Sequence, residues 1–174
     1  MKVLSSPERL GDMDAIILPG VGNFKAASQN IQPFRSTILC LVREGALLFG
    51  ICLGLQLLFE ESEESPGSGL ELLQGRVLRL PQKVKTPHMG WNTLRICREN
   101  ELLEGISEEA YFYFVHSYHA NPVNEEAIVA RTDYGVSFAS VISYRNIYGT
   151  QFHPEKSGES GARILENLVR IIKK

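Results

Sequence analysis

The sequence predicts an α/β fold with an open, mostly parallel sheet flanked by helices and with additional antiparallel strands. In the first half of the chain, short apolar runs of strand length alternate with helical patterns and end in glycine-containing turns, which is typical of parallel strands joined by crossovers. In the second half, short β-rich runs follow one another closely, which favours antiparallel or mixed pairing. The 174 residues suit a single domain spanning 1–174.

The first half is expected to contain two strand–turn–helix units. Residues 14–19 and 46–51 are the apolar runs, and both predict buried strands. A helix is expected after each of them, over residues 23–44 and 52–61. Pro33 is expected to interrupt the first helix, because proline has no N–H to donate.

The second half begins after residues 60–69, an acidic stretch of small residues that predicts a solvated loop. Five β-rich runs follow, at 76–80, 93–97, 111–115, 127–131 and 136–142. Apolar residues at helical spacing then predict an amphipathic helix over 161–173.

Composition excludes several classes of function. The net charge of −2 offers no electrostatic footprint for nucleic acid or for an anionic membrane. The chain has neither a signal-peptide pattern nor an apolar run long enough to span a membrane. Its three cysteines are odd in number and form no Cys-x-x-Cys pair, so no disulfide framework or zinc site is expected. We therefore expect a cytoplasmic protein.

The strongest chemical motif is Gly50-Ile-Cys-Leu-Gly-Leu-Gln56, where a predicted strand turns into a predicted helix. A nucleophile on such a turn is lifted above the sheet edge, and the helix N-terminus favours a thiolate. Cys52 is therefore the candidate nucleophile, and the N–H of Leu53 is a candidate oxyanion donor. The alternative is a buried cysteine with a purely structural role.

A thiol nucleophile needs a base, and His153 in the sequence His-Pro-Glu is the candidate. Glu155 could fix the tautomer and orientation of the imidazole, as the third member of a triad does. Taken alone, this tripeptide is also typical of a surface turn. A metal site is the rival use of several histidines, but their spacings match no zinc pattern, and no metal or cofactor is expected.

The loop Pro19-Gly-Val-Gly-Asn-Phe24 leaves the first predicted strand at its carboxyl end, where ligands of open α/β sheets bind. Its glycines allow close backbone approach, so the loop could supply a second oxyanion donor opposite Leu53. It lacks the Lys-Ser/Thr of a phosphate-binding P-loop and the third glycine of a dinucleotide-binding loop.

These motifs resemble those of the class I (triad) glutamine amidotransferases, which implies a flavodoxin-like fold. More narrowly, four segments are similar to the glutaminase subunits of imidazole glycerol phosphate synthases: residues 19–24, Pro87-His-Met-Gly-Trp-Asn92, Phe114-Val-His-Ser-Tyr118 and residues 152–157. The resemblance runs from about residue 14 to the C-terminus.

The resemblance implies hydrolysis of glutamine to glutamate and ammonia through a thioester on Cys52. His153 would act as base and then as acid, and Glu155 would orient it. An N–H of Val21 or Gly22 would join that of Leu53 in holding the oxyanion. Further pocket residues are implied, and they are Gly20, Gln56, Ser117 and Tyr118. Ser117 and Tyr118 could alternatively do no more than end a strand.

The resemblance also implies a partner, a (β/α)₈-barrel cyclase that receives the ammonia and makes imidazole glycerol phosphate in histidine biosynthesis. Residues 88–92 are the candidate docking loop, with Met89 and the sole tryptophan, Trp91, as anchors. Trp91 could instead lie in the core of the domain. Lys156 could face the same interface or be solvated.

Three rival interpretations stay open from sequence: another cysteine hydrolase on this fold, the glutaminase subunit of a different amidotransferase, and a non-catalytic partner of a synthase. The family usually begins with an additional strand and helix, led by a loop of the type Asp-Tyr-Gly-x-Gly-Asn. Neither precedes Val3-Leu4, which would be the second strand of the sheet. The first βα unit is therefore expected to be missing, and Met1 could be an internal start.

Overall fold

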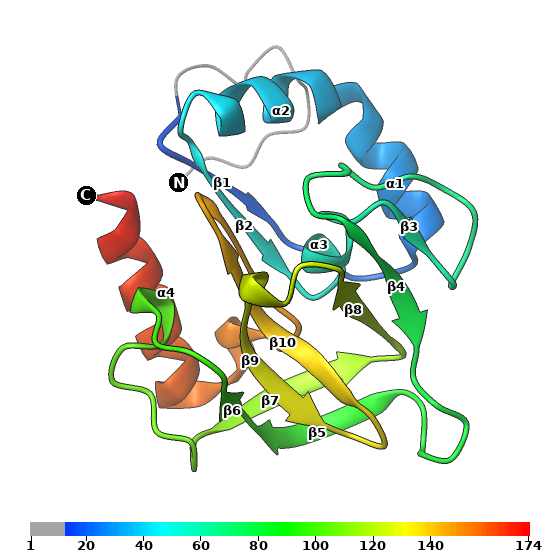
Figure 1. Cartoon of the computed structure of the whole chain (residues 1–174), viewed down its shortest axis with the longest axis vertical. Coiled ribbons are helices and arrows are strands. Elements are labelled where there is room, and N and C mark those ends of the chain that lie inside the picture. The colour runs from blue at the N-terminus through cyan, green and yellow to red at the C-terminus, as the bar shows by residue number, and fades with distance from the viewer. Residues whose placement is uncertain (1–12) are drawn as a thin grey trace.

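The computed structural model describes residues 13–174, and its main element is a six-stranded sheet in the order β1-β2-β11-β10-β9-β6 (Figure 1). Two parallel pairs join its first three strands, which are β1 (Ala15–Leu18), β2 (Leu47–Ile51) and β11 (Ile147–Thr150). Antiparallel pairs add the others, which are β10 (Ser137–Tyr144), β9 (Ile128–Asp133) and β6 (Arg95–Ile96). The mixed α/β fold is thus confirmed.

Two smaller sheets lie beside the main one. The first contains β3 (Glu61–Ser62), β4 (Gly75–Arg79) and β8 (Tyr118–Pro122), in that order. The second is an antiparallel ribbon of β5 (His88–Thr93) and β7 (Tyr111–His116). Only Ser117 separates β7 from β8, so one short turn connects the two smaller sheets.

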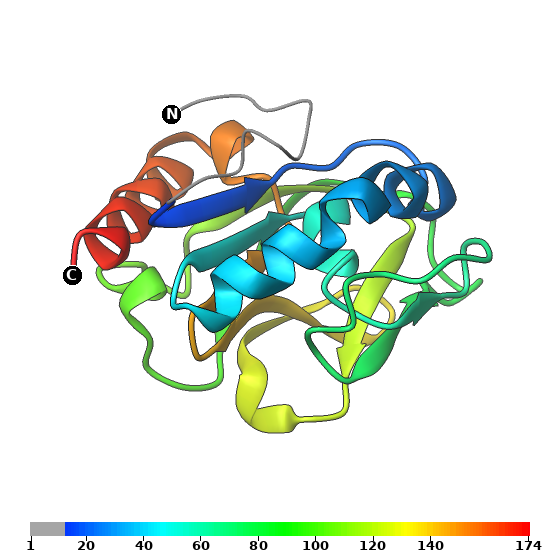
Figure 2. The same cartoon turned by 90° about the horizontal axis from the view of Figure 1, so that it is seen from above.

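Helices cover both faces of the parallel strands (Figure 2). Residues 13–174 form four α-helices, which are α1 (Phe24–Ile31), α2 (Arg35–Arg43), α3 (Leu53–Gln56) and α4 (Gly158–Ile172). Four short 3₁₀ turns complete the described elements: η2 (Gln32–Phe34), η3 (Glu101–Leu103), η4 (Glu125–Ala127) and η5 (Pro154–Lys156).

The fully buried strand β2 divides the apolar interior into two clusters, because successive side chains of a strand point to opposite faces. Leu48 lies in the cluster that α1, α2 and α3 cover. Leu47 and Phe49 lie in the other cluster, which Ile164 and Leu168 of α4 close. The sheet is therefore sandwiched between helical layers, and the carboxyl ends of β1 and β2 are left for the site.

Several predicted elements are confirmed with small shifts in their bounds. The helical stretch after β1 is interrupted at Pro33, where η2 separates α1 from α2. The C-terminal helix begins at Gly158, three residues before the predicted start. The predicted strand at Val3-Leu4 lies outside the described residues.

The helix predicted over 52–61 is wrong in length, because α3 ends at Gln56. The chain beyond it pairs with residues 69–73 instead of continuing the helix: the N–H of Leu70 donates to the carbonyl of Leu57 at 2.7 Å, and that of Leu72 donates to the carbonyl of Leu58 at 2.9 Å. The predicted loop over 60–69 likewise contains the short strand β3.

The docking loop predicted over 88–92 is also wrong in type, since these residues form most of strand β5. Trp91 pairs with Tyr113 across the ribbon, and their rings meet edge to face at 5.8 Å. No β-rich run marks this segment, so its strand depends on pairing with the aromatic strand β7.

Candidate active site

Cys52 lies on the sharp turn between β2 and α3, as predicted. It is one of three non-glycine residues with positive φ in the described chain, with φ 53° and ψ −105°. Such a conformation costs about 1–3 kcal/mol and persists only where the surroundings enforce it. Here the N–H of Cys52 donates to the carbonyl of Thr150 at 2.7 Å, and its carbonyl accepts from Gln56 N at 3.1 Å.

Close packing around the turn explains the glycines on either side of it. A Cβ on Gly20 would lie 2.5 Å from Leu53 Cβ and 2.6 Å from the Gly54 nitrogen. A Cβ on Gly54 would overlap the carbonyl oxygen of Leu18. The loop after β1 is therefore pressed directly against the turn that carries Cys52.

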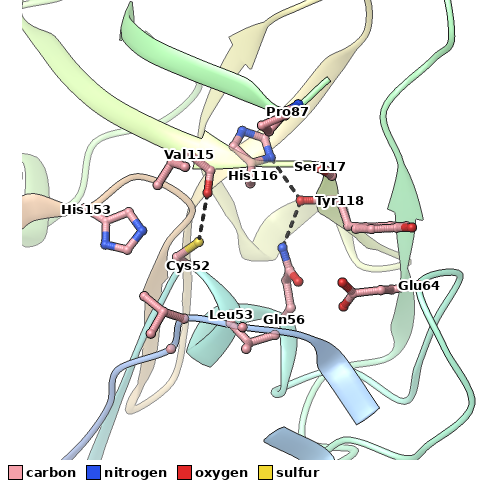
Figure 3. A pocket seen from close by; sticks show the side chains of 13 residues that line it. Cys52, Leu53, Gln56, Glu64, Pro87, Val115, His116, Ser117, Tyr118 and His153 are labelled. Carbon is pink, nitrogen blue, oxygen red and sulfur yellow. Dashed lines mark hydrogen bonds between the residues drawn. The ribbon is translucent and has the colours of Figure 1, made fainter. Parts of the chain in front are cut away.

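The Cys52 thiol is buried and protonated at rest. Burial raises its pKa to about 11, although hydrogen bonds from the N–H of Leu53 and the side chain of Gln151 act in the opposite direction. The sulfur lies 3.8 Å from the carbonyl oxygen of Val115 (Figure 3). It also lies 3.6 Å from Gln151 Nε2. A neutral thiol of this kind needs a base before it can attack a carbonyl carbon.

His153, the candidate base, lines the same cavity as this thiol (Figure 3). It follows β11 and precedes η5, and its N–H donates to the carbonyl of Tyr113 at 2.9 Å. The hydroxyl of Ser157 donates to the carbonyl of His153 at 2.6 Å and accepts from Tyr113 N at 3.0 Å. The backbone of His153 is therefore fixed against β7.

The imidazole of His153 has one tautomer that suits its contacts. Nδ1 lies 2.7 Å from a carboxylate oxygen of Glu155, which can only accept, so in the neutral imidazole Nδ1 carries the hydrogen and Nε2 carries the lone pair. Within residues 13–174, His153 Nε2 is the only buried side-chain nitrogen or oxygen without a hydrogen-bond partner. A buried polar atom of this kind calls for an explanation, and a role in proton transfer supplies one.

A cavity of about 290 Å³ lies over the thiol, at the lower end of the range for ligand pockets. It is lined by residues from the loop after β1, the turn and α3, the segment 115–118 and three separate positions: Gly20, Val21, Gly22, Cys52, Leu53, Gln56, Glu64, Pro87, Val115, His116, Ser117, Tyr118 and His153. All the residues predicted for oxyanion and glutamine binding lie in this lining.

Sequence reasoning missed Glu64, Val115 and Gln151. Glu64 is the one carboxylate in the lining, and Figure 3 shows it on the side of the cavity near Gln56. It accepts from the N–H of Phe24 at 2.6 Å, which ties the acidic loop to the start of α1. No local motif marks Glu64, because this contact joins residues 40 positions apart.

The residues predicted for the partner interface lie outside the cavity. Met89 and Trp91 are exposed on β5, with 63% and 55% of their surface accessible, so the alternative of a Trp in the core is excluded. Lys156 is exposed at the end of η5. Among the described residues, no cluster of His, Cys, Asp or Glu has the arrangement of a metal site.

None of the helices between residues 13 and 174 has the length and apolar character needed to cross a bilayer. The family model for class I glutamine amidotransferases matches residues 3–172.

Curated relatives match nearly the whole chain, and three of them share one name, imidazole glycerol phosphate synthase subunit HisH. The protein from Methanothermobacter thermautotrophicus is 53% identical, and the match covers 98% of this chain and 86% of the relative. That from Methanocaldococcus jannaschii is 49% identical, with 98% and 87% covered. That from Archaeoglobus fulgidus is 45% identical, with 100% and 87% covered.

Solved structures of lower identity share the fold. A crystal structure of a glutamine amidotransferase superposes with a TM-score of 0.77 at 20% identity, covering 99% of this chain and 86% of that one. The glutaminase domain of Trypanosoma brucei CTPS gives a TM-score of 0.60 at 19% identity, covering 95% and 73%. The chain belongs to the class I glutamine amidotransferase family, in the group of the HisH subunits of imidazole glycerol phosphate synthase.

Proposed function

We propose that this protein hydrolyses glutamine to glutamate and ammonia, with Cys52 as nucleophile, His153 as general base and acid, and Glu155 as the group that orients His153. The observation that carries the proposal is the unpartnered Nε2 of His153 in the same cavity as a protonated thiol on a strained turn. In the neutral imidazole this nitrogen has a lone pair, so it can accept the proton of the Cys52 thiol.

In the acylation half of the reaction, the Cys52 proton passes to His153 Nε2 while the sulfur bonds to the carboxamide carbon of glutamine. Negative charge develops on the carboxamide oxygen, where the N–H of Leu53 and an N–H from Val21 or Gly22 donate. The carbon–nitrogen bond then breaks, and His153 returns the proton to the leaving nitrogen, which departs as ammonia.

In the deacylation half, a water molecule attacks the thioester carbon while His153 Nε2 takes its proton. The carbon–sulfur bond breaks, glutamate leaves, and the proton returns to the Cys52 sulfur. Glu155 keeps the hydrogen on Nδ1 throughout and stabilises the imidazolium that forms twice in each cycle.

The amino-acid end of glutamine, which carries the α-ammonium and α-carboxylate groups, binds at the side of the cavity where Glu64 and Gln56 lie. Glu64 offers a carboxylate for the α-ammonium group, as charge complementarity requires. Gly20, Gln56, Ser117 and Tyr118 supply the remaining polar and backbone surface of the pocket.

The ammonia is used by a synthase, since the relatives are named as subunits of imidazole glycerol phosphate synthase. The partner we propose is a (β/α)₈-barrel cyclase that makes imidazole glycerol phosphate in histidine biosynthesis. Met89 and Trp91 on β5 are its docking anchors, and the exposed Lys156 is a further residue of the proposed interface. The chain then acts as a single domain over 1–174 in a cytoplasmic heterodimer, without a cofactor and without binding nucleic acid or membrane.

The test is a glutaminase assay on the complex with the cyclase. Cys52→Ala is expected to abolish glutamate production while the complex keeps synthase activity with added ammonia. Cys40→Ala and Cys97→Ala are matched controls, since both thiols are exposed and lie outside the cavity. Retained glutaminase activity in Cys52→Ala, or its loss in either control, would contradict the assignment.

A further inference from the structure

Two buried histidines, His116 in the cavity lining and His88 next to it, have no part in the chemistry described so far. His88 begins β5 and His116 ends β7, and the two face each other in the register of the ribbon. They are 3% and 5% exposed. The His88 ring is stacked between Tyr134, at 3.9 Å, and Phe114, at 4.9 Å, so its orientation is fixed by packing.

The hydrogen bonds of this pair allow a single arrangement of protons. His116 Nδ1 lies 2.9 Å from the carbonyl oxygen of Tyr118, which can only accept, so this nitrogen carries the hydrogen and His116 Nε2 accepts. His88 Nδ1, at 3.0 Å from that Nε2, must therefore donate, and His88 Nε2 accepts from the side-chain amide of Asn92 at 3.3 Å.

Both imidazoles are neutral in this arrangement. Burial lowers the pKa of His116 to about 3 and that of His88 to about 4. Every donor in the series Asn92, His88, His116 is thus directed toward the carbonyl of Tyr118.

The same carbonyl is held from the other side by the active site. Gln56 Nε2 donates to it at 2.8 Å and lies 3.3 Å from Gln151 Oε1. Gln151 Nε2 in turn lies 3.6 Å from the Cys52 sulfur. An unbroken series of hydrogen bonds therefore runs from Asn92 on the exposed strand β5 to the thiol, and its central part is visible in Figure 3.

We propose that His88 and His116 are positioning residues of the glutaminase reaction: they fix the Tyr118 carbonyl, and through it Gln56 and Gln151, against glutamine and the thiol. The inference rests on the proposed function, because it concerns the same cavity. Without the donor from His116, the Tyr118 carbonyl keeps one partner only, and the Gln56 carboxamide that lines the cavity loses its fixed anchor.

The experiment compares aromatic replacements, which keep the packing and remove the hydrogen bonds. His88→Phe, His116→Phe and the double variant are assayed in the complex with the cyclase. Rates are expressed per active site, titrated with an electrophilic glutamine analogue that alkylates Cys52. This normalisation removes any loss that is due to partial unfolding.

Each single variant is expected to lower kcat/KM for glutamine about tenfold, the equivalent of one hydrogen bond. The double variant is expected to lose little more than the worse single variant, because the two residues act in series. His116→Asn keeps a side-chain N–H in the place of Nδ1 and is expected to recover most of the activity lost in His116→Phe.

His119→Phe is the matched control. His119 is also buried, and its ring lies 5.5 Å from that of Phe138, but its Nδ1 lies near the carbonyl of Ala120 rather than that of Tyr118. The activity per active site of the His119→Phe variant is expected to stay within about twofold of the native value.

The proposal is overturned if His119→Phe matches the loss in His116→Phe, if the single losses add in the double variant, or if His116→Asn is no better than His116→Phe. The activity of the native complex in the same assay distinguishes failure of this proposal from failure of the proposed function. An inactive native complex would refute the glutaminase assignment, whereas an active native complex with unaffected variants would refute only the role of the histidine pair.

Discussion

The neutral histidine pair should make folding stability depend on pH, and the size of the effect follows from the pKa values. In the unfolded chain each imidazole has its ordinary pKa of about 6.5. In the folded chain, burial lowers the pKa of His116 to about 3 and that of His88 to about 4. As the pH falls below about 6.5, the unfolded state takes up protons that the folded state does not, so stability is lost.

Each histidine should cost about 2 kcal/mol of unfolding free energy between pH 7.5 and pH 5, or about 4 kcal/mol for the pair. Urea unfolding at the two pH values measures this loss. The double variant His88→Phe/His116→Phe is the comparison, because it leaves the carboxylates and His119 to titrate as before. We expect the native protein to lose about 4 kcal/mol more than the variant over this interval. An equal loss in both proteins would refute the neutral, buried state of the pair.

Three further predictions concern the cavity and the partner surface. Glu155→Gln should lower kcat by about 10²-fold or more in steady-state assays, because a carboxamide can donate to Nδ1 and thereby shift the hydrogen to Nε2; an unchanged rate would exclude the orienting role. Glu64→Gln should raise KM for glutamine about tenfold with a smaller change in kcat, since it weakens ground-state binding of the ammonium group; a loss confined to kcat would contradict this. Trp91→Ala should weaken binding to the cyclase by about 2 kcal/mol in calorimetric titration, whereas Val123→Ala, a control at an even more exposed apolar residue outside β5, should not; equal effects would count against β5 as the docking strand.

Local patterns in the sequence were sufficient to predict the strand–turn–helix unit around Cys52. A buried run, two glycines and the following apolar residues belong to one short segment, and the steric demand on Gly50 comes from Gly54 and Leu55 of that same turn. His153 and Glu155 could be predicted for the same reason, since their contact joins residues two positions apart.

The rest depends on contacts between distant segments, which periodicity does not encode. The early end of α3 results from pairing with residues 69–73, and β5 forms because β7 lies alongside it. Glu64 is held at the cavity by its hydrogen bond to the N–H of Phe24, 40 residues away in the sequence. The partners of His88 and His116 are brought together by the β5–β7 ribbon and by the turn to β8.

The central claim is that glutamine is cleaved through a thioester on Cys52. The most direct measurement is mass spectrometry of the complex, acid-quenched during turnover with glutamine and then digested into peptides. The peptide that contains Cys52 should carry a mass gain equal to glutamine minus ammonia, and this adduct should be absent after Cys52→Ala. Steady production of glutamate with no adduct on Cys52, or with an adduct on another residue, would contradict the account.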